Sequence, residues 1–238
     1  MNKVKMISAT QLSMFEECQR KWWAFYVKKI PRPEPTEAIK LGLAIHKILE
    51  LSLLAKQKGM DQYSDPRSLI KAACKEHDLN AADTARLPML IQNAEKMGWF
   101  DNYEISRPEF ELKYKIDDVG VIIRVDRQTE LDDHVKIVDI KSGKYPYETD
   151  ELKKNWQTRL YSLPFLETKP VSMEFWFVRF FHKKPHILLD FNDKEEFLTD
   201  ARTLIKKMRE CDGSQYNEGW GCKWCAFKEE CIKMRKQR

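Results

Sequence analysis

The sequence predicts an α/β protein with one mixed central β-sheet, and three observations indicate this fold class. Apolar residues recur every three or four positions over 8–58, which is typical of amphipathic helices. From about residue 108 the period changes to two, as in half-buried strands. Helical spacing returns over 150–163 and 194–210, with two further strand-like runs between them. This order of elements favours a single sheet flanked by helices.

Length and composition are compatible with one packed domain. The chain has 238 residues, of which 42% are hydrophobic and 33% charged, so disorder throughout the chain is excluded. A net charge of +5 permits nucleic-acid binding without requiring it. No run of about 18 apolar residues occurs, and the first residues do not resemble a secretory signal. We therefore expect an intracellular, cytoplasmic protein that does not bind membranes.

Three helical segments are predicted before the sheet. They cover residues 8–29, 37–58 and 66–99. Ser8 or Thr10 would cap the first segment, because a hydroxyl oxygen can accept an N–H of the first turn. The proline-rich segment 31–35 would end it. Breaks in the third segment are expected near 78–80 and at Pro88, since proline lacks the amide hydrogen that a helix interior needs.

Five strands are predicted after residue 108. They cover residues 109–116, 121–127, 135–141, 171–181 and 186–191. Turns at 117–120 and 132–133 would join the first three strands into an antiparallel meander, and 182–185 would turn the last two into a hairpin. The predicted helix over 150–163 separates the two groups of strands.

Acidic residues and a lysine meet at the end of the third predicted strand. Asp139 and Lys141 share a face of that strand, and Asp126 lies near the end of its hairpin partner. The two carboxylates could hold one divalent ion, which neutralises developing charge and activates water for phosphodiester hydrolysis. Acid-x-Lys occurs four times in the sequence, as chance predicts, so only the strand context singles out this pair. The alternative is an ordinary surface ion pair.

Two helical pairs add polar side chains. His46 and Glu50 are neighbours at i and i+4, so the carboxylate could orient the imidazole or join it at a metal. The alternative for His46 is an ordinary core histidine. Gln157 and Tyr161 have the same spacing and could contact a nucleic-acid strand. Their alternative is a half-buried tyrosine beside a surface glutamine.

Six cysteines in an intracellular chain indicate metal or redox use rather than disulfides. They occupy positions 18, 74, 211, 222, 225 and 231. The last three lie within ten residues, and the first two of those have a common metal-chelating spacing. As the fourth ligand we choose Cys18, with Cys211 as the local alternative, and we expect Cys74 to be a core residue. Spacing alone leaves zinc and an iron–sulfur cluster both open.

The ordered set of motifs resembles the RecB-like branch of the PD-(D/E)XK nuclease superfamily. In chain order the motifs are His46, Asp126, Asp139-Ile140-Lys141 and Gln157-x-x-x-Tyr161. The segment 8–23 is similar to that branch's opening helix, with its first cluster cysteine. The tail cysteines are similar to those of members with a 4Fe-4S cluster, among them bacterial recombination and CRISPR-adaptation nucleases. The resemblance covers about residues 8–231. It implies a restriction-endonuclease-like core whose ends are joined by a cysteine-bound cluster.

The resemblance also implies a role for each site residue. His46, Asp126, Asp139 and the Ile140 carbonyl would bind Mg²⁺ or Mn²⁺, and Asp126, Asp139 and Lys141 would be the catalytic residues. Lys141 would orient or activate the attacking water.

Two further groups of residues receive roles in the same way. Gln157 and Tyr161 would contact the DNA strand or support the site. The 4Fe-4S cluster would be held by Cys18, Cys222, Cys225 and Cys231.

We therefore expect one nuclease domain over residues 1–238. Its expected parts are N-terminal helices with the first cluster cysteine (1–58), a helical insertion (59–107), the catalytic sheet core (108–210) and an iron–sulfur tail (211–238). The expected activity is exonucleolytic cleavage of single-stranded DNA or DNA ends in recombination, repair or processing. No G-x-x-x-x-G-K-[ST] phosphate loop occurs, so a helicase or a recombination or adaptation protein would be a separate partner. The alternatives are a non-catalytic DNA-binding or assembly module and a zinc-stabilised endonuclease.

Overall fold

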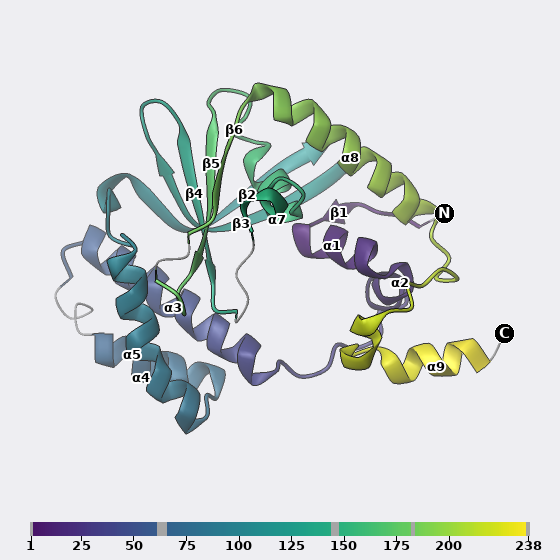
Figure 1. The fold of residues 1–238 in the computed structure, drawn as a ribbon, viewed down its shortest axis with the longest axis horizontal. Coiled ribbons are helices and arrows are strands. Elements are labelled where there is room, and N and C mark those ends of the chain that lie inside the picture. Colours follow the sequence, from purple (N-terminus) through teal and green to yellow (C-terminus); the bar gives the residue numbers. More distant parts are fainter. Residues whose placement is uncertain (1, 61–65, 144–147, 182–183, 237–238) are drawn as a thin grey trace.

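A computed structural model gives the fold of the chain (Figure 1). It describes residues 2–60, 66–143, 148–181 and 184–236. The expected turn at 182–185 thus lies partly outside the described residues. Within the described residues, no helix combines the length and apolar character that crossing a membrane requires.

Six strands form one mixed sheet, which confirms the predicted fold class. They are β1 (Met6–Ile7), β2 (Ser106–Ile116), β3 (Val119–Glu130), β4 (Val135–Lys141), β5 (Val171–Phe177) and β6 (His186–Leu189). The strand order is β1-β3-β4-β5-β6, and β2 also pairs with β3. β2, β3 and β4 form the predicted antiparallel meander, β4 and β5 are parallel, and β5 and β6 form the predicted hairpin. β1 is parallel to β3 and was not predicted, because two residues are too few to show a period.

Helices cover both faces of the sheet. The helices of the described residues are α1 (Ala9–Glu17), α2 (Gln19–Tyr26), α3 (Glu37–Gln57), α4 (Pro66–His77), α5 (Ala81–Lys96), α6 (Thr149–Leu152), α7 (Trp156–Ser162), α8 (Phe191–Glu210) and α9 (Lys228–Lys236), of which α9 packs on the N-terminal helices and not on the sheet. One core contains side chains of α1, α7 and α8 against the sheet. A second core joins α3, α4 and α5 to Val138, Ile140 and Trp176 on the opposite face. The sheet therefore lies between two helical layers.

The helix predicted over 8–29 is two helices. Cys18 has an extended backbone (φ −162°, ψ 111°) and separates α1 from α2. The Ser8 side chain accepts the Gln11 N–H, so Ser8 rather than Thr10 caps α1. The break gives Cys18 a place at a helix junction, where a side chain can lie beside a third segment of the chain.

Other predicted boundaries also shift. The helix predicted over 150–163 is divided into α6 and α7, with Asn155 as the N-cap of α7. The strand expected to reach 181 ends at Phe177. Pro88 does not break its helix, because α5 runs through it. Pro88 is exposed while Leu87 and Leu90 are buried, so packing of the apolar face outweighs the one helical hydrogen bond that proline removes.

A buried arginine fixes β3 to the segment after α5. Arg127 is 2% exposed and donates hydrogen bonds to the carbonyls of Gly98 (3.0 Å) and Trp99 (2.6 Å) and to Ser106 Oγ (3.1 Å). Burial disfavours the charged guanidinium and lowers the pKa of Arg127 to about 10. Because Arg127 directly follows Asp126, these contacts also fix the backbone of the candidate site.

Candidate active site

The candidate site lies where β3 and β4 separate. Their ladder includes Arg127 opposite Val138 and extends no closer to Asp126 among the described pairs. Beyond that pair the Asp126 side chain connects the two strands, because its Oδ2 accepts the backbone N–H of Ile140. The strand that carries Asp139 is thereby held against the strand that carries Asp126, and both predicted acids lie at the same end of the meander.

His46 reaches this place from the other helical layer. A Cβ added to Gly42 would lie 3.2 Å from Ser142 Oγ, so glycine permits the close approach of α3 to the residue after Lys141. One turn further along α3, His46 Nδ1 lies 3.0 Å from Asp126 Oδ1. His46 is half-buried and lies beside Asp126 at the candidate site. The expectation that Glu50 orients His46 or joins it at a metal is wrong, because the Glu50 carboxylate pairs with Lys47 Nζ at 2.9 Å.

Glu109 is a site residue that the sequence analysis missed. Its Oε1 lies 3.7 Å from His46 Nδ1, and the ligand atoms of His46, Glu109 and Asp126 all lie within 4.8 Å of one another. The register of β2 and β3 places Glu109 opposite Asp126, between the pairs that Pro108 and Phe110 make. A two-residue hairpin turn would have predicted this register. Glu109 has a φ of +44°, a conformation that L-residues rarely adopt within a strand.

Asp139, Lys141 and α7 form a second polar group beside the first. Lys141 Nζ lies 2.5 Å from Asp139 Oδ2 and donates to Gln157 Oε1 at 2.6 Å. Gln157 Nε2 donates to Asp139 Oδ1 at 2.7 Å and to the hydroxyl oxygen of Tyr161 at 3.3 Å. The predicted acid, lysine, glutamine and tyrosine are therefore brought together, and the glutamine contacts all three of the others.

Charge and burial set the proton affinities of these groups. Burial of Asp139, which is 3% exposed, raises the pKa of its carboxyl to about 6, although the Lys141 ammonium opposes that shift. Burial disfavours the charged imidazolium of His46, but Asp126 and Glu109 outweigh it and raise the pKa of His46 well above its usual value. Burial also raises the pKa of Tyr161, which keeps its hydroxyl neutral.

The arrangement is suited to binding a hard divalent cation. An imidazole and two carboxylates lie close enough to share one ion, and oxygen and nitrogen donors of this kind suit Mg²⁺ and Mn²⁺. Asp139 is outside this group of three, and its buried Oδ2 pairs with the Lys141 ammonium at 2.5 Å. A cation bound by His46, Glu109 and Asp126 would therefore have the Asp139–Lys141 pair beside it.

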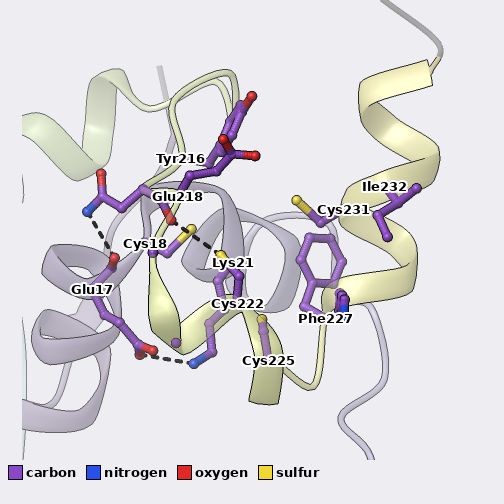
Figure 2. A pocket seen from close by; sticks show the side chains of 14 residues that line it. Glu17, Cys18, Lys21, Tyr216, Glu218, Cys222, Cys225, Phe227, Cys231 and Ile232 are labelled. Atoms are coloured by element: carbon purple, nitrogen blue, oxygen red, sulfur yellow. Dashed lines mark hydrogen bonds and ion pairs between the residues drawn. The ribbon is translucent and has the colours of Figure 1, made fainter.

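All four cysteines that are predicted to hold a cluster line one pocket, and none of the candidate active-site residues lines it. Its volume is about 370 Å³, and Figure 2 shows the side chains around it. Cys18 comes from the α1–α2 junction, Cys222 from a short 3-10 turn (Trp220–Trp224), Cys225 from its end, and Cys231 from α9. Cys211 does not line this pocket. It ends α8 and is buried, and burial raises the pKa of its thiol.

The remaining cysteine does not line this pocket, and other side chains join the C-terminal tail to the N-terminal helices. Cys74 packs against the second core, as expected. Phe227 packs on Phe25 of α2, with ring centroids 5.8 Å apart. Arg20 is buried, donates to the carbonyls of Gly213 (3.0 Å) and Ser214 (2.8 Å), and lies 3.7 Å from Cys231 Sγ. Contacts between side chains and backbone therefore already hold the C-terminal tail on the N-terminal helices.

The geometry of the candidate active site agrees with a comparison to known families. The family model of the PD-(D/E)XK nuclease superfamily matches residues 6–232, which is nearly the whole chain. The chain belongs to the PD-(D/E)XK nuclease superfamily. PD-(D/E)XK enzymes are hydrolases that cut nucleic acids with divalent metal ions, and the group of His46, Glu109 and Asp126 could bind such an ion.

Solved structures of similar fold extend the comparison. The "Putative exonuclease" from Eubacterium rectale matches with a TM-score of 0.57 at 11% identity, over 95% of this PD-(D/E)XK chain and 88% of its own. At that identity the likeness shows the fold alone. The structure of SSO0001 matches at a TM-score of 0.44 and 13% identity, over 97% of this chain and 87% of its own. No curated protein matches the sequence.

Proposed function

We propose that this PD-(D/E)XK protein is a deoxyribonuclease of the RecB-like branch that removes nucleotides from single strands or DNA ends with Mg²⁺ or Mn²⁺. The observation that carries the proposal is the convergence of His46, Glu109 and Asp126 beside the Asp139–Lys141 pair. The name of the Eubacterium rectale neighbour supports exonuclease over endonuclease action.

The residues divide the work of hydrolysis between them. His46, Asp126, Asp139 and the Ile140 carbonyl would hold the metal, and Glu109 joins them. A bound divalent ion supplies an activated water and neutralises the charge that develops on the phosphate. Lys141 Nζ, held beside Asp139, donates a hydrogen bond that orients the attacking water and offsets that charge.

Gln157 has a supporting role in this proposal. Its side-chain oxygen accepts from Lys141 and its amide nitrogen donates to Asp139, so both ends are engaged within the site. Tyr161 accepts a hydrogen bond from the same nitrogen and limits rotation of the amide. We therefore assign to both residues the orientation of Lys141 and Asp139 rather than a contact with the DNA strand.

Cleavage of end-labelled DNA tests the nuclease proposal. Asp139→Ala and Lys141→Ala should each lower the rate in Mg²⁺ or Mn²⁺ by about 100-fold or more, the loss typical when a key electrostatic group is removed. Glu167→Ala is a matched control, because Glu167 and Lys169 form another acid-x-Lys match and Glu167 is exposed. Equal cleavage by Asp139→Ala and wild type would contradict the mechanism. DNA binding without any cleavage by wild type would support the non-catalytic module.

We further propose that Cys18, Cys222, Cys225 and Cys231 hold a 4Fe-4S cluster. Thiolates are suited to zinc and to iron–sulfur clusters alike. Four sulfurs at about 2.3 Å from one tetrahedral zinc would lie about 3.8 Å apart. Within the described residues no three cysteine sulfurs approach within 4.8 Å of one another, which favours a larger group with several metal atoms.

Anaerobic purification tests the cluster. Broad visible absorption and about four irons per chain are expected, and Cys222→Ser should lose both while Cys74→Ala keeps them. One zinc per chain without visible absorption would instead support the zinc-stabilised alternative. We also propose recombination, repair or CRISPR adaptation as the setting, with a helicase or an adaptation protein as the partner.

A further inference from the structure

A second pocket lies apart from the candidate active site and from the pocket that the cysteines line. Its volume is about 430 Å³, and it is bounded by the N-terminal segment with β1, by α1, and by the end of α2. Its charged lining side chains are Lys3, Lys5 and Lys29, and no acidic residue of the described chain lines it. Concave sites lined by charge of one sign concentrate ligands of the opposite sign.

The three lysines are held around this pocket without acidic partners. Lys3 and Lys5 alternate along the extended N-terminal segment, so they share a side, while Val4 between them is buried. Lys29 follows α2 in a left-handed conformation (φ 58°). Within the described part of the chain none of the three makes an ion pair or a side-chain hydrogen bond. Their charges are therefore available to a ligand.

A buried hydrogen-bond donor is an independent observation at the same pocket. Trp22 lines it and is 2% exposed, yet its indole Nε1–H has no acceptor among the described residues. Trp22 stacks on Tyr26 (6.1 Å between centroids), and the Tyr26 hydroxyl accepts a hydrogen bond from Arg32 at 2.5 Å. Native proteins rarely leave such donors without an acceptor. This nitrogen has almost no accessible surface, so an anionic oxygen would satisfy it only by displacing the side chains that cover it.

We propose that this pocket binds phosphate groups of single-stranded DNA, as a second, non-catalytic contact with the strand that the active site cuts. The inference rests on the proposed deoxyribonuclease function. Three cations and one indole donor suit phosphodiester oxygens, which carry charge without sequence information. The pocket lies beside elements that also carry site residues: β1 pairs with β3 at Gly120 and Val121, five residues or more before Asp126, and α1 packs on α7, which carries Gln157.

Binding of labelled single-stranded DNA in Ca²⁺ tests the proposal without cleavage. The variant Lys3→Gln/Lys5→Gln/Lys29→Gln should bind about tenfold more weakly at low salt. The slope of log affinity against log salt should fall by about 2, since each phosphate contact on a single strand contributes about 0.7. Its melting temperature should match that of wild type, because all three side chains are exposed.

A matched variant separates this pocket from overall charge. Lys71→Gln/Lys75→Gln/Lys207→Gln removes the same charge from exposed positions on α4 and α8 and should keep wild-type affinity and salt slope. An equal loss in both variants, or no loss in either, would overturn the proposal. A wild-type protein that binds DNA in this way but does not cut it would refute the proposed nuclease function and leave the pocket supported.

The Trp22 indole provides a second readout. In ¹⁵N-labelled protein its N–H resonance, assigned with Trp22→Phe, should shift when a short thymidine oligonucleotide is added. Inorganic pyrophosphate should produce a shift in the same direction if phosphate alone is recognised. An unmoved Trp22 resonance at saturating oligonucleotide would contradict a phosphate contact at this donor. A shift with pyrophosphate but not with the oligonucleotide would assign the pocket to a free anion instead of a DNA strand.

Discussion

At the scale of single residues, Asp126 links the parts of the site. One oxygen accepts the Ile140 N–H and fixes the spacing of β3 and β4, and the other faces His46. A carboxylate held from both sides loses little conformational freedom when it binds a metal ion. Glu109, opposite Asp126 across the β2–β3 ladder, adds a second carboxylate near the same nitrogen of His46.

The structure predicts that Glu109 strengthens metal binding. Glu109→Gln keeps the shape of the side chain and removes its charge, so the affinity for Mn²⁺ should fall by about 10- to 100-fold. Isothermal titration calorimetry measures this change. Glu111→Gln is the matched control, because Glu111 lies two residues further along β2 and pairs with exposed Arg124. Equal Mn²⁺ affinity in Glu109→Gln and Glu111→Gln would contradict the assignment.

Metal binding should also release protons. The pKa of His46 is raised well above its usual value and that of Asp139 to about 6, and both groups must be deprotonated to bind a cation. Affinity for Mn²⁺ should therefore rise with pH through about 6 and continue to rise beyond the ordinary histidine pKa as His46 loses its proton. Calorimetry at pH 7 in two buffers of different ionisation enthalpy counts the protons, and His46→Gln should release fewer.

Without metal, the contribution of His46 to the stability of the fold falls as pH rises, whereas the affinity for metal rises with pH. Its pKa is higher in the folded state than in the unfolded state, because Asp126 and Glu109 favour the imidazolium. Its contribution to stability is therefore complete below the unfolded pKa of about 6.5 and is lost as pH rises through the folded pKa.

In the calorimetric test of metal binding, identical proton release by wild type and His46→Gln would show that this histidine does not bind the metal.

At the scale of elements, tertiary packing overrides local preference in two places. Cys18 interrupts a run of helical periodicity that the sequence continues, and the extended residue turns α2 toward the tail. Pro88 has the reverse effect, since a residue that normally ends a helix lies inside α5. In both cases buried contacts on neighbouring residues decide the path of the backbone.

Replacing Pro88 should therefore stabilise the protein. Pro88→Ala restores the hydrogen bond to the Thr84 carbonyl and removes a ring clash from an exposed helix position, at no cost in packing. The free energy of unfolding should rise by about 1–3 kcal/mol, since proline costs about 3 kcal/mol in a helix interior and alanine has a more flexible unfolded state. Urea denaturation measures it. Ala85→Pro, at another exposed position of α5, should lower it by a similar amount.

At the scale of the whole molecule, the two ends of the chain lie together. Asn2 donates to the carbonyls of Met208 (3.0 Å) and Cys211 (2.6 Å), and Asn217 donates to that of Glu17 (2.9 Å). The tail beyond Cys211 is joined to the rest by few apolar residues, chiefly Phe227. A cluster across this junction would add the strongest link between the ends.

Loss of the cluster should accordingly free the tail before the sheet unfolds. In the anaerobically purified protein, Cys222→Ser should lower the melting temperature by about 10 °C, equivalent to about 3–4 kcal/mol for a chain of this size. Protease should then cut first within 211–231. Cys74→Ala, which changes the other core, should not produce that early cut. An unchanged melting curve for Cys222→Ser would show that the junction is stable without the cluster.

The sequence by itself determined the features that depend on neighbouring residues. Period two predicted the meander and placed Asp139 and Lys141 on one face, and the spacing of the tail cysteines predicted a metal-binding group. Only the tertiary structure decided that Glu109 faces His46, that Cys18 interrupts a helix and that Gln157 holds Asp139. These depend on strand register and on packing between segments far apart in the chain. The register could be predicted only with the exact length of the turn before β3. Local periodicity does not reveal the packing, because that is set by burial of surfaces that meet only in the folded state.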